Sequence, residues 1–297
     1  MNKGFGVLSL ACSLVGCGPL LDLPESPELV SVDEGPWQCL DEAPSTQGPS
    51  SATARVQVQA CDFITNCANP VTGLSARLCA KRDVGCTNPI VTDIHDEKGL
   101  LTVEVPTSGT GFDGYLEVTA PSKPCTDETF GQVGPMLCGL LPGCDLEAPD
   151  EACDFATYVR ALLFFNPPVT EDLSAPMPLP LLPSAGLPSV VEAAGADLDP
   201  TTGNLFITAM DCEGKPAEGV TYGISQHQDK VTQLYVDDGV VSDTSLQTDE
   251  SGIGGFVGVP PGFAEVVGFN ADLEKVGSIG VQAAPFTLTY SALVPSP

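Results

Sequence analysis

Short runs of alternating apolar and polar residues recur along most of this chain. In residues 55–60 and 100–106 every second side chain is apolar, and residues 205–210 are apolar almost throughout. A period of two residues sends successive side chains to opposite faces of a strand, so these runs predict half-buried β-strands. Turns rich in Gly, Pro, Asn and Asp separate them, as is typical of antiparallel sandwiches. We therefore expect an all-β fold.

The same order of signals occurs in both halves of the chain. Each half begins with a strand and continues with a Pro-containing turn that ends in Gly. An acidic turn and a second strand follow, and a Gly-Phe corner leads into a further strand. The matching segments are 55–60 and 205–210, 69–74 and 214–220, 96–106 and 248–259, and 111–119 and 262–268. A recurring order of this kind predicts a duplicated module.

A Pro-rich stretch at residues 166–200 separates the two halves. Its prolines exclude a sheet interior and a long helix, although a short helix is expected at residues 189–194. The expected organisation is two tandem antiparallel β-sandwich modules, at residues 53–165 and 201–297. A Cys-rich segment at residues 121–156 is interpreted as an insertion in the first module.

The balance of charge narrows the classes of partner. The chain of 297 residues has 39 acidic and 11 basic residues, for a net charge of −28. A polyanion repels phosphate backbones and anionic lipid, so nucleic-acid binding and docking through a basic patch are disfavoured. Calcium or a basic partner is better tolerated, but a solvated acidic surface is the simplest interpretation.

The N-terminal residues predict export. Lys3 gives a short positive start, and residues 4–15 are apolar and uncharged but too short to span a bilayer. This is typical of a secretory signal peptide. The next residues, Leu14-Val15-Gly16-Cys17, resemble the lipobox of bacterial lipoproteins. The resemblance implies cleavage after Gly16, acylation of Cys17, and a lipid-anchored protein whose residues 17–52 contain a tether.

Two further expectations follow from that resemblance. Gly18, rather than Asp, follows Cys17, and by the sorting rule of the family this implies delivery to the outer membrane. Two or more acyl chains anchor a protein stably, whereas one chain binds reversibly. The expected partners are therefore the membrane, through the lipid, and an envelope protein or glycan.

Ten cysteines remain when Cys12 and Cys17 are set aside, and in an exported chain an even number predicts disulfides. Their spacings fit no zinc motif. Nine of the ten lie between Cys39 and Cys153, so complete oxidation requires Cys212 to pair with the first half. We expect this disulfide to join the two halves; the alternative is that Cys212 stays reduced.

A second resemblance rests on the turns of the second half. Gly-x-Pro-x-x-Gly-Val at residues 214–220, Thr-Asp-x-x-Gly-x-x-x-Phe at 248–256 and the Pro-Gly turn at 261–262 resemble the carboxypeptidase regulatory-like module. The first half is similar more loosely. The family implies a transthyretin-like β-sandwich without catalytic residues. A lipobox with two such modules is similar to lipoproteins of myxobacterial type.

The residues that carry chemistry are sparse. The two histidines, His95 and His227, are in no zinc-peptidase motif, and no Gly-x-Ser-x-Gly occurs. Several acidic residues offer oxygens for calcium, but their spacing is not that of an EF-hand. They are Asp237, Asp238, Asp243, Asp249 and Glu250. We therefore expect no cofactor, no resident metal and no catalytic residue.

Three functional hypotheses remain. The first is a non-enzymatic structural or interaction module of the cell envelope. The second is a carbohydrate-binding lipoprotein, for which the candidate ligand-facing aromatics are Phe112, Tyr115, Tyr222 and Tyr235. Burial of all four would remove the support for it. The third is an enzyme, which requires a hollow that gathers His95 or His227 with carboxylates.

Overall fold

A computed structural model describes residues 36–41, 51–65, 67–107, 109, 111–124, 154–226 and 230–296. Residues 35–297 form one compact unit. Cys17, the expected tether up to residue 35, His227 and the cysteines between residues 125 and 153 lie outside the described residues. None of the described helices is long and apolar enough to cross a membrane.

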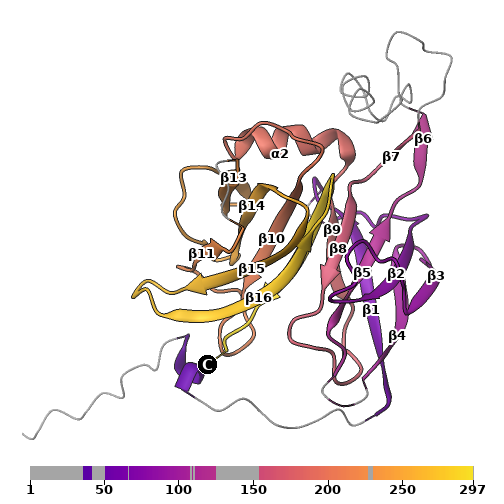
Figure 1. Ribbon diagram of the computed structural model, residues 1–297, viewed down its shortest axis with the longest axis horizontal. Helices are drawn as coiled ribbons and strands as arrows, with labels where there is room; N and C mark the ends of the chain where they lie inside the picture. The colour runs from indigo at the N-terminus through magenta and orange to yellow at the C-terminus, as the bar shows by residue number, and fades with distance from the viewer. Residues whose placement is uncertain are drawn as a thin grey trace, which may run out of the picture. The chain divides into compact units, whose positions relative to one another are not determined.

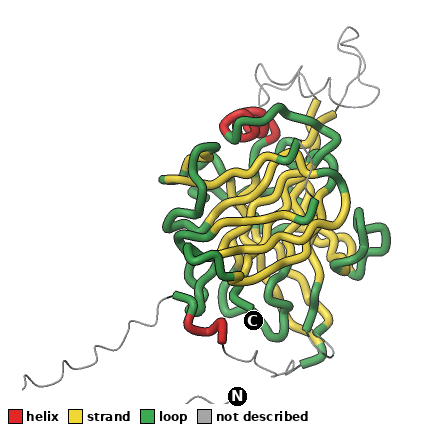
Figure 2. Tube along the Cα trace, turned by 60° about the vertical axis from the view of Figure 1, so that its left-hand side comes forward, coloured by secondary structure: helices red, strands yellow, loops and turns green. Residues whose placement is uncertain are grey.

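Strands are the main secondary structure of the described chain and make up about half of it, and its helices are short (Figures 1 and 2). The structure therefore confirms the all-β fold. The strands of the first half are β1 (Thr53–Asp62), β2 (Ser75–Ala80), β3 (Val91–His95), β4 (Leu100–Pro106), β5 (Gly114–Thr119), β8 (Arg160–Phe164) and β9 (Met177–Leu181), with the small pair β6 (Ser122–Pro124) and β7 (Asp154–Ala156) between β5 and β8.

The second half continues with one helix region and eight strands. The helical segments among the described residues are η1 (Gln38–Asp41), η3 (Ser184–Gly186) and α2 (Leu187–Ala193). The strands are β10 (Gly203–Ala209), β11 (Thr221–Ile224), β12 (Thr232–Asp237), β13 (Val240–Ser242), β14 (Ile253–Val259), β15 (Gly262–Phe269), β16 (Lys275–Ala283) and β17 (Thr287–Leu293). Helix α2 lies where a short helix was expected, and strand β9 occupies the Pro-rich stretch as an edge strand, where prolines are tolerated.

One nine-stranded sheet runs through both halves, in the order β13-β12-β14-β10-β17-β8-β5-β2-β3. A three-stranded sheet, β4-β1-β9, packs on one face, and a second, β11-β15-β16, packs on the other. The halves meet where β17 and β8 pair in parallel, with Thr287 opposite Arg160. Two further pairs, β1–β9 and β10–β17, are also parallel, so the sandwich layers are mixed sheets.

The strand order of the first half resembles that of the second half. In the first half β1 lies between β4 and β9, and in the second half β10 lies between β14 and β17. Likewise β5 lies between β2 and β8, and β15 lies between β11 and β16. We call the seven strands β1–β5, β8 and β9 the first repeat, and β10–β17 the second repeat.

The turns of the two repeats also form equivalent hydrogen bonds. The Ala60 amide donates to Gly99 at 2.8 Å, and the Ala209 amide donates to Gly252 at the same distance. Both glycines have positive φ, 85° and 68°, which Gly adopts without a steric penalty. The Pro turns also match, since Pro70 and Pro216 each form an isolated bridge with the strand that precedes them. The sequence similarity therefore reflects equal local structure.

Two hydrophobic cores lie on opposite faces of the long sheet, and each contains residues from both repeats. The first includes Leu179 of β9 and Tyr290 of β17. The second includes Phe164 of β8 and Val281 of β16. The pairing of β8 with β17 is therefore covered from both sides, which makes the two repeats one packed body.

Three disulfides lie among the described residues: Cys39–Cys212, Cys61–Cys67 and Cys79–Cys86. Cys212 does pair with a cysteine of the first half, as expected, but its partner Cys39 precedes the first repeat. The bond therefore fastens the segment at residues 36–41, rather than a strand of the first repeat, to the second repeat. Trp37 and Leu40 pack against the second core, and the Cys212 amide donates to the Pro36 carbonyl at 3.0 Å.

Candidate functional site

The four aromatic residues predicted to face a ligand are buried instead. Their exposed fractions are 5% for Phe112, 0% for Tyr115, 6% for Tyr222 and 2% for Tyr235. Tyr115, Tyr222 and Tyr235 face the second core, and Phe112 faces the first. Alternation marks one face of a strand but does not tell whether that face is covered. These rings offer no face to a sugar, so the prediction of ligand-facing aromatics is wrong and the carbohydrate hypothesis loses its support.

The hydroxyl groups of the three buried tyrosines form hydrogen bonds that stabilise the fold. Tyr115 stacks on Phe164 with ring centroids 4.7 Å apart and donates to the Asp83 carbonyl at 2.6 Å. Burial raises the pKa of the Tyr115 hydroxyl to about 12, and the charge of Glu117 adds to the rise. Burial also holds the pKa of Tyr222 well above its usual range. A neutral buried phenol with a fixed partner is a structural element.

A polar hollow of about 350 Å³ lies on the first repeat, on a part of the long sheet that has polar outward residues. Register places Ser75 of β2 between His95 of β3 and Thr119 of β5. The hollow is lined by Ser75, Arg77, Asp93, His95, Glu117 and Thr119, among others. The structure therefore brings His95 together with two carboxylates, as the enzyme hypothesis required.

The groups in this hollow are engaged with one another. The Ser75 and Thr119 hydroxyls share a hydrogen bond of 2.8 Å, and among the described residues neither hydroxyl bonds to His95. A nucleophile needs a base within hydrogen-bond reach. The hollow accordingly lacks the geometry for nucleophilic catalysis in the part of the chain that the structure describes.

Glu117 is the buried charge at the centre of this region, with a side chain only 3% exposed. Its carboxylate lies 2.9 Å from the Arg77 guanidinium and 3.4 Å from that of Arg160. A buried carboxylate needs such partners, because the loss of hydration otherwise disfavours its charge. Sequence reasoning missed this residue, although a single Glu within the apolar run Tyr115–Val118 was a signal.

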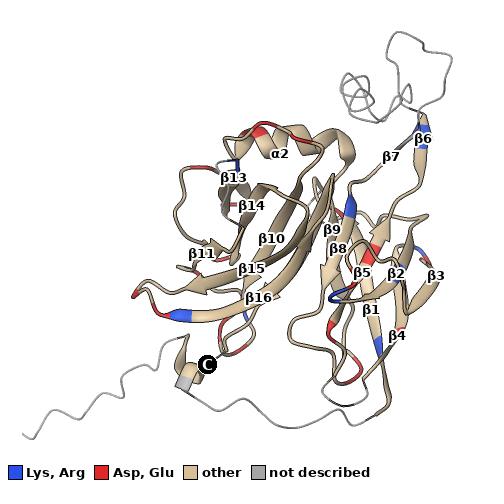
Figure 3. Ribbon diagram, viewed as in Figure 1, with Lys and Arg blue, Asp and Glu red and all other residues tan. Residues whose placement is uncertain are grey.

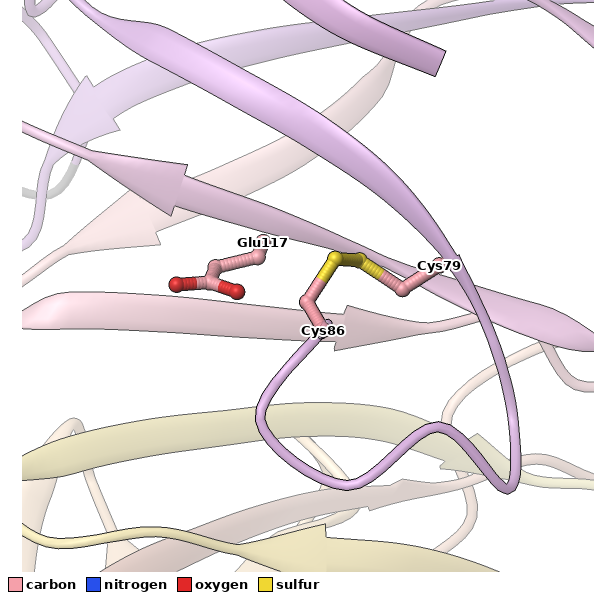
Figure 4. Close-up of side chains that lie close together, drawn as sticks. All are labelled: Cys79, Cys86 and Glu117. Atoms are coloured by element: carbon pink, nitrogen blue, oxygen red, sulfur yellow. A yellow bond between two sulfur atoms is a disulfide. The ribbon is translucent and has the colours of Figure 1, made fainter. Parts of the chain in front are cut away.

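Glu117 also lies beside a disulfide, and together they are the group most similar to a metal site among the described residues. One ligand atom each of Cys79, Cys86 and Glu117 lies within 4.8 Å of the others (Figure 4). The two sulfur atoms are bonded to each other, and a metal needs thiolates as ligands. With Glu117 paired to two arginines, this group is a structural one in the oxidised protein.

The acidic residues considered for calcium support turns of the second repeat. The two carboxylate oxygens of Asp249 accept from the Ser251 amide at 2.9 Å and from the Asp238 amide at 3.0 Å. Asp237 accepts from the Ser245 hydroxyl at 3.2 Å. Asx-turn bonds of this kind are the usual role of Asp beside Gly.

The distribution of charge differs between the repeats. Acidic positions occur in both halves of the chain, whereas basic positions are more frequent in the first half (Figure 3). Seven of the 11 basic residues fall between Arg55 and Arg160, and three fall in the second repeat: Lys215, Lys230 and Lys275.

Comparison with known proteins assigns no family. No family model matches the chain, and no curated protein matches it. A solved structure of a streptococcal ancillary pilin is similar at 11% identity and a TM-score of 0.22, covering 82% of this chain and 69% of that one. The minor pilin of Streptococcus agalactiae is similar at 16% identity and a TM-score of 0.21, covering 82% and 95%. Similarity at this level assigns neither fold nor function.

Proposed function

We propose that this protein is a non-catalytic envelope lipoprotein, anchored through Cys17, that acts as a rigid structural and interaction module. The lipobox at Leu14–Cys17 supports the anchor. The observation that carries the structural role is the Cys39–Cys212 disulfide, with a Cα–Cα distance of 5.7 Å. It fastens the segment nearest the proposed anchor to the second repeat.

This bond would determine how load passes through an anchored protein. A pull on the N-terminal segment reaches Cys39 and passes through the disulfide to Cys212, across a sequence separation of 173 residues. The first repeat lies within the closed loop and carries no load along its backbone. At ~3.5 Å per residue the loop shields about 600 Å of extended chain.

The packing of the two repeats supports the same role. Both faces of the β8–β17 pair are covered by cores that combine the two repeats. The charged groups around His95 are engaged with one another, as Glu117 is with Arg77 and Arg160. A body of this kind is suited to holding surface loops and strand edges in fixed positions.

Metabolic labelling with a clickable palmitate analogue, in a bacterial host that exports the full chain, tests the anchor. We expect the wild-type protein to be labelled and to fractionate with the outer membrane, and Cys17→Ala to lose both properties. Cys12→Ala is the matched control, since Cys12 lies inside the predicted signal peptide. Labelling that persists in Cys17→Ala would overturn the proposed anchor.

Single-molecule pulling on the two ends of the exported chain tests the structural role. With the disulfide intact, the released contour length should fall short of that of the reduced protein by about 600 Å, at ~3.5 Å per residue. Equal lengths in both states would show that the Cys39–Cys212 bond does not carry the load.

A further inference from the structure

The two repeats differ in the partner of their third strand. In the first repeat the third strand, β3, pairs with β2. In the second repeat the third strand, β12, pairs with β14, which is the counterpart of β4. As a result β4 has a neighbour on one side only, whereas β14 has a neighbour on both. The same switch leaves β11, the counterpart of β2, as an edge strand.

The β11 edge is closed by side chains. The Tyr222 amide donates to the Tyr235 hydroxyl at 3.0 Å, and the Gln233 side-chain amide donates to the Tyr222 carbonyl at 2.8 Å. Both side chains come from β12, the strand that has moved to the other sheet. The outward backbone amide and carbonyl of Tyr222, which a neighbouring strand would use, are therefore already paired.

The β4 edge has no such cover among the described residues. The backbone hydrogen bonds from Ala60 to Gly99 and from Thr107 to Ala52 show which residues of β4 bond to β1. The odd-numbered residues of β4 direct their backbone N–H and C=O groups toward β1, and the even-numbered residues direct theirs away from it. The amides and carbonyls of Thr102 and Glu104 consequently point outward. Both residues are exposed, while Leu101, Val103 and Val105 between and beside them are buried.

The ends of this edge limit its length. Leu100 exchanges both of its backbone bonds with Glu97, and Pro106 has no amide hydrogen. Thr102 and Glu104 thus offer two donors and two acceptors, and the Pro106 carbonyl offers one more acceptor. A segment of this length suits the addition of a short extended peptide, as in known β-augmentation.

We propose that the open edge of β4 binds an extended strand of a partner protein, antiparallel to β4, as β12 binds β14 in the second repeat. The partner's residues opposite Val103 and Val105 would be apolar, because they extend the inner face of the sheet. This inference rests on the interaction role proposed above and does not depend on the anchor at Cys17.

The negative charge around Glu104 indicates which residues the partner strand carries on its other face. Beside the edge lies a hollow of about 540 Å³, lined by the carboxylates of Glu104, Glu171 and Asp172 and by one cation, Arg55. Asp172 also accepts from the Arg55 amide at 2.7 Å. A basic side chain opposite Glu104 complements this excess of negative charge. The partner is therefore an extended segment in which apolar and basic residues alternate.

Amide hydrogen exchange on the full chain tests whether the edge is open. We expect the Thr102 and Glu104 amides to exchange far faster than those of Val103 and Val105, which face β1. Slow exchange at Thr102 and Glu104 would show that another part of the chain covers the edge, and it would overturn the proposal.

A peptide with the sequence of residues 231–236 and two added lysines at each end is the probe for binding. Titration followed by NMR should give a saturable response at Thr102 and Glu104. Thr102→Pro removes one outward amide without touching the core, and we expect binding weaker by roughly tenfold or more. Thr102→Ser, which keeps the amide, should bind like the wild type. Saturation in folded Thr102→Pro equal to wild type would overturn the proposal.

Charge reversal provides a second variant in case Thr102→Pro does not fold. Glu104→Lys should bind the lysine-flanked peptide more weakly and prefer the same peptide flanked by glutamates. An unchanged preference would contradict the assigned edge. A dimer in solution that Glu104→Lys disrupts would instead assign the edge to a second copy, against the proposed partner. None of these results depends on lipidation, which the Cys17 labelling tests separately.

Discussion

The two repeats use the same seven strand positions but send the third strand to opposite sheets. In the first repeat the chain after β2 is held close to it, because the Cys79–Cys86 disulfide closes the loop and the Ile90 amide donates to Leu78 at 2.7 Å. In the second repeat β12 continues into β13 through a tight turn with positive φ at Asp238 and Gly239. The loop after β2 in the first repeat and the turn after β12 in the second thus hold the third strand beside different neighbours.

The consequences of this switch also differ. The second repeat compensates for its open β11 edge with Tyr235 and Gln233. The first repeat leaves the β4 edge unpaired within the described chain, with Glu104 and Pro106 as the residues that deter indiscriminate pairing. Duplication therefore yields one closed and one open module, and the open one is where a partner strand fits.

Removal of the Cys39–Cys212 disulfide should give the largest loss of stability. In the chain-entropy model its separation of 173 residues contributes about 5 kcal/mol, against about 2 kcal/mol for Cys61–Cys67 with its separation of 6. We expect Cys39→Ser/Cys212→Ser to lower the urea midpoint strongly. Trp37, the one tryptophan of the chain, packs on the second core, so its fluorescence should shift to the red.

The pair Cys61→Ser/Cys67→Ser is the matched control within the first repeat. It should lower the free energy of unfolding by less and leave the emission of Trp37 unchanged. Equal losses from the two pairs would mean that the closed loop, and hence the docking of residues 36–41, does not contribute as the entropy model requires.

Glu117→Gln should give the next largest effect. The change leaves Arg77 and Arg160 beside a neutral amide, and we expect a loss of about 2 kcal/mol. This is below the ~3–5 kcal/mol of a fully buried pair, because the two arginine side chains are 42% and 35% exposed. Urea denaturation measures the change in the free energy of unfolding.

Glu265→Gln is the control from the second repeat. Glu265 lies on the outward face of β15, as Glu117 does on β5, but it is exposed because no sheet covers that face. Its substitution should change the free energy of unfolding by less than ~0.5 kcal/mol. A cost similar to that of Glu117→Gln would show that burial does not distinguish the two positions.

Tyr235→Phe should leave a backbone amide unpaired at the β11 edge of the second repeat, as at the β4 edge of the first. The hydroxyl accepts the Tyr222 amide at 3.0 Å, and its loss leaves that buried donor unpaired, at a cost of about 1–2 kcal/mol. Hydrogen exchange at the Tyr222 amide should accelerate. Tyr115→Phe is the control in the first repeat, since it removes a single bond to Asp83. Unchanged protection of Tyr222 would mean that its edge is closed by something other than Tyr235.

Local patterns predicted much of the fold, because they depend on neighbouring residues. The alternation at residues 55–60 lies within β1, and the short helix expected at 189–194 overlaps α2. Counting cysteines predicted that Cys212 pairs with the first half, and the structure gives Cys39. The counting could not choose among nine candidates, so docking of the expected tether on the second repeat was missed.

Long-range features could not be predicted in the same way. The pairing of β17 with β8 joins segments more than a hundred residues apart, and nothing in either strand specifies the other. The aromatic residues at 115 and 222 were expected to face a ligand, since alternation reports one covered face only. In the central strands β5, β8, β10 and β17 of the shared sheet, residues on both faces are buried, and Tyr222 of β11 faces the same second core from the smaller sheet.

In the folded protein we expect almost no phenolate at moderately alkaline pH. Burial raises the pKa of Tyr115 in the first repeat to about 12, and burial together with the hydrogen bond to Asp62 raises that of Tyr158 to about 12. In the second repeat burial also raises the pKa of Tyr222, Tyr235 and Tyr290. A free tyrosine, with a pKa of about 10, would be mostly ionised at pH ~10.5.

The sign of the linked stability change follows from these directions. Above pH ~10 the unfolded chain loses its phenolic protons while the folded protein keeps them, so the free energy of unfolding falls as pH rises from about 10 to about 12. Phenolate absorbance followed with circular dichroism measures both. We expect ionisation to begin at the first-repeat tyrosines or to coincide with unfolding. A half-complete titration near pH 10 with an unchanged circular dichroism spectrum would show that these rings reach solvent. It would also contradict the burial of both faces of the shared sheet.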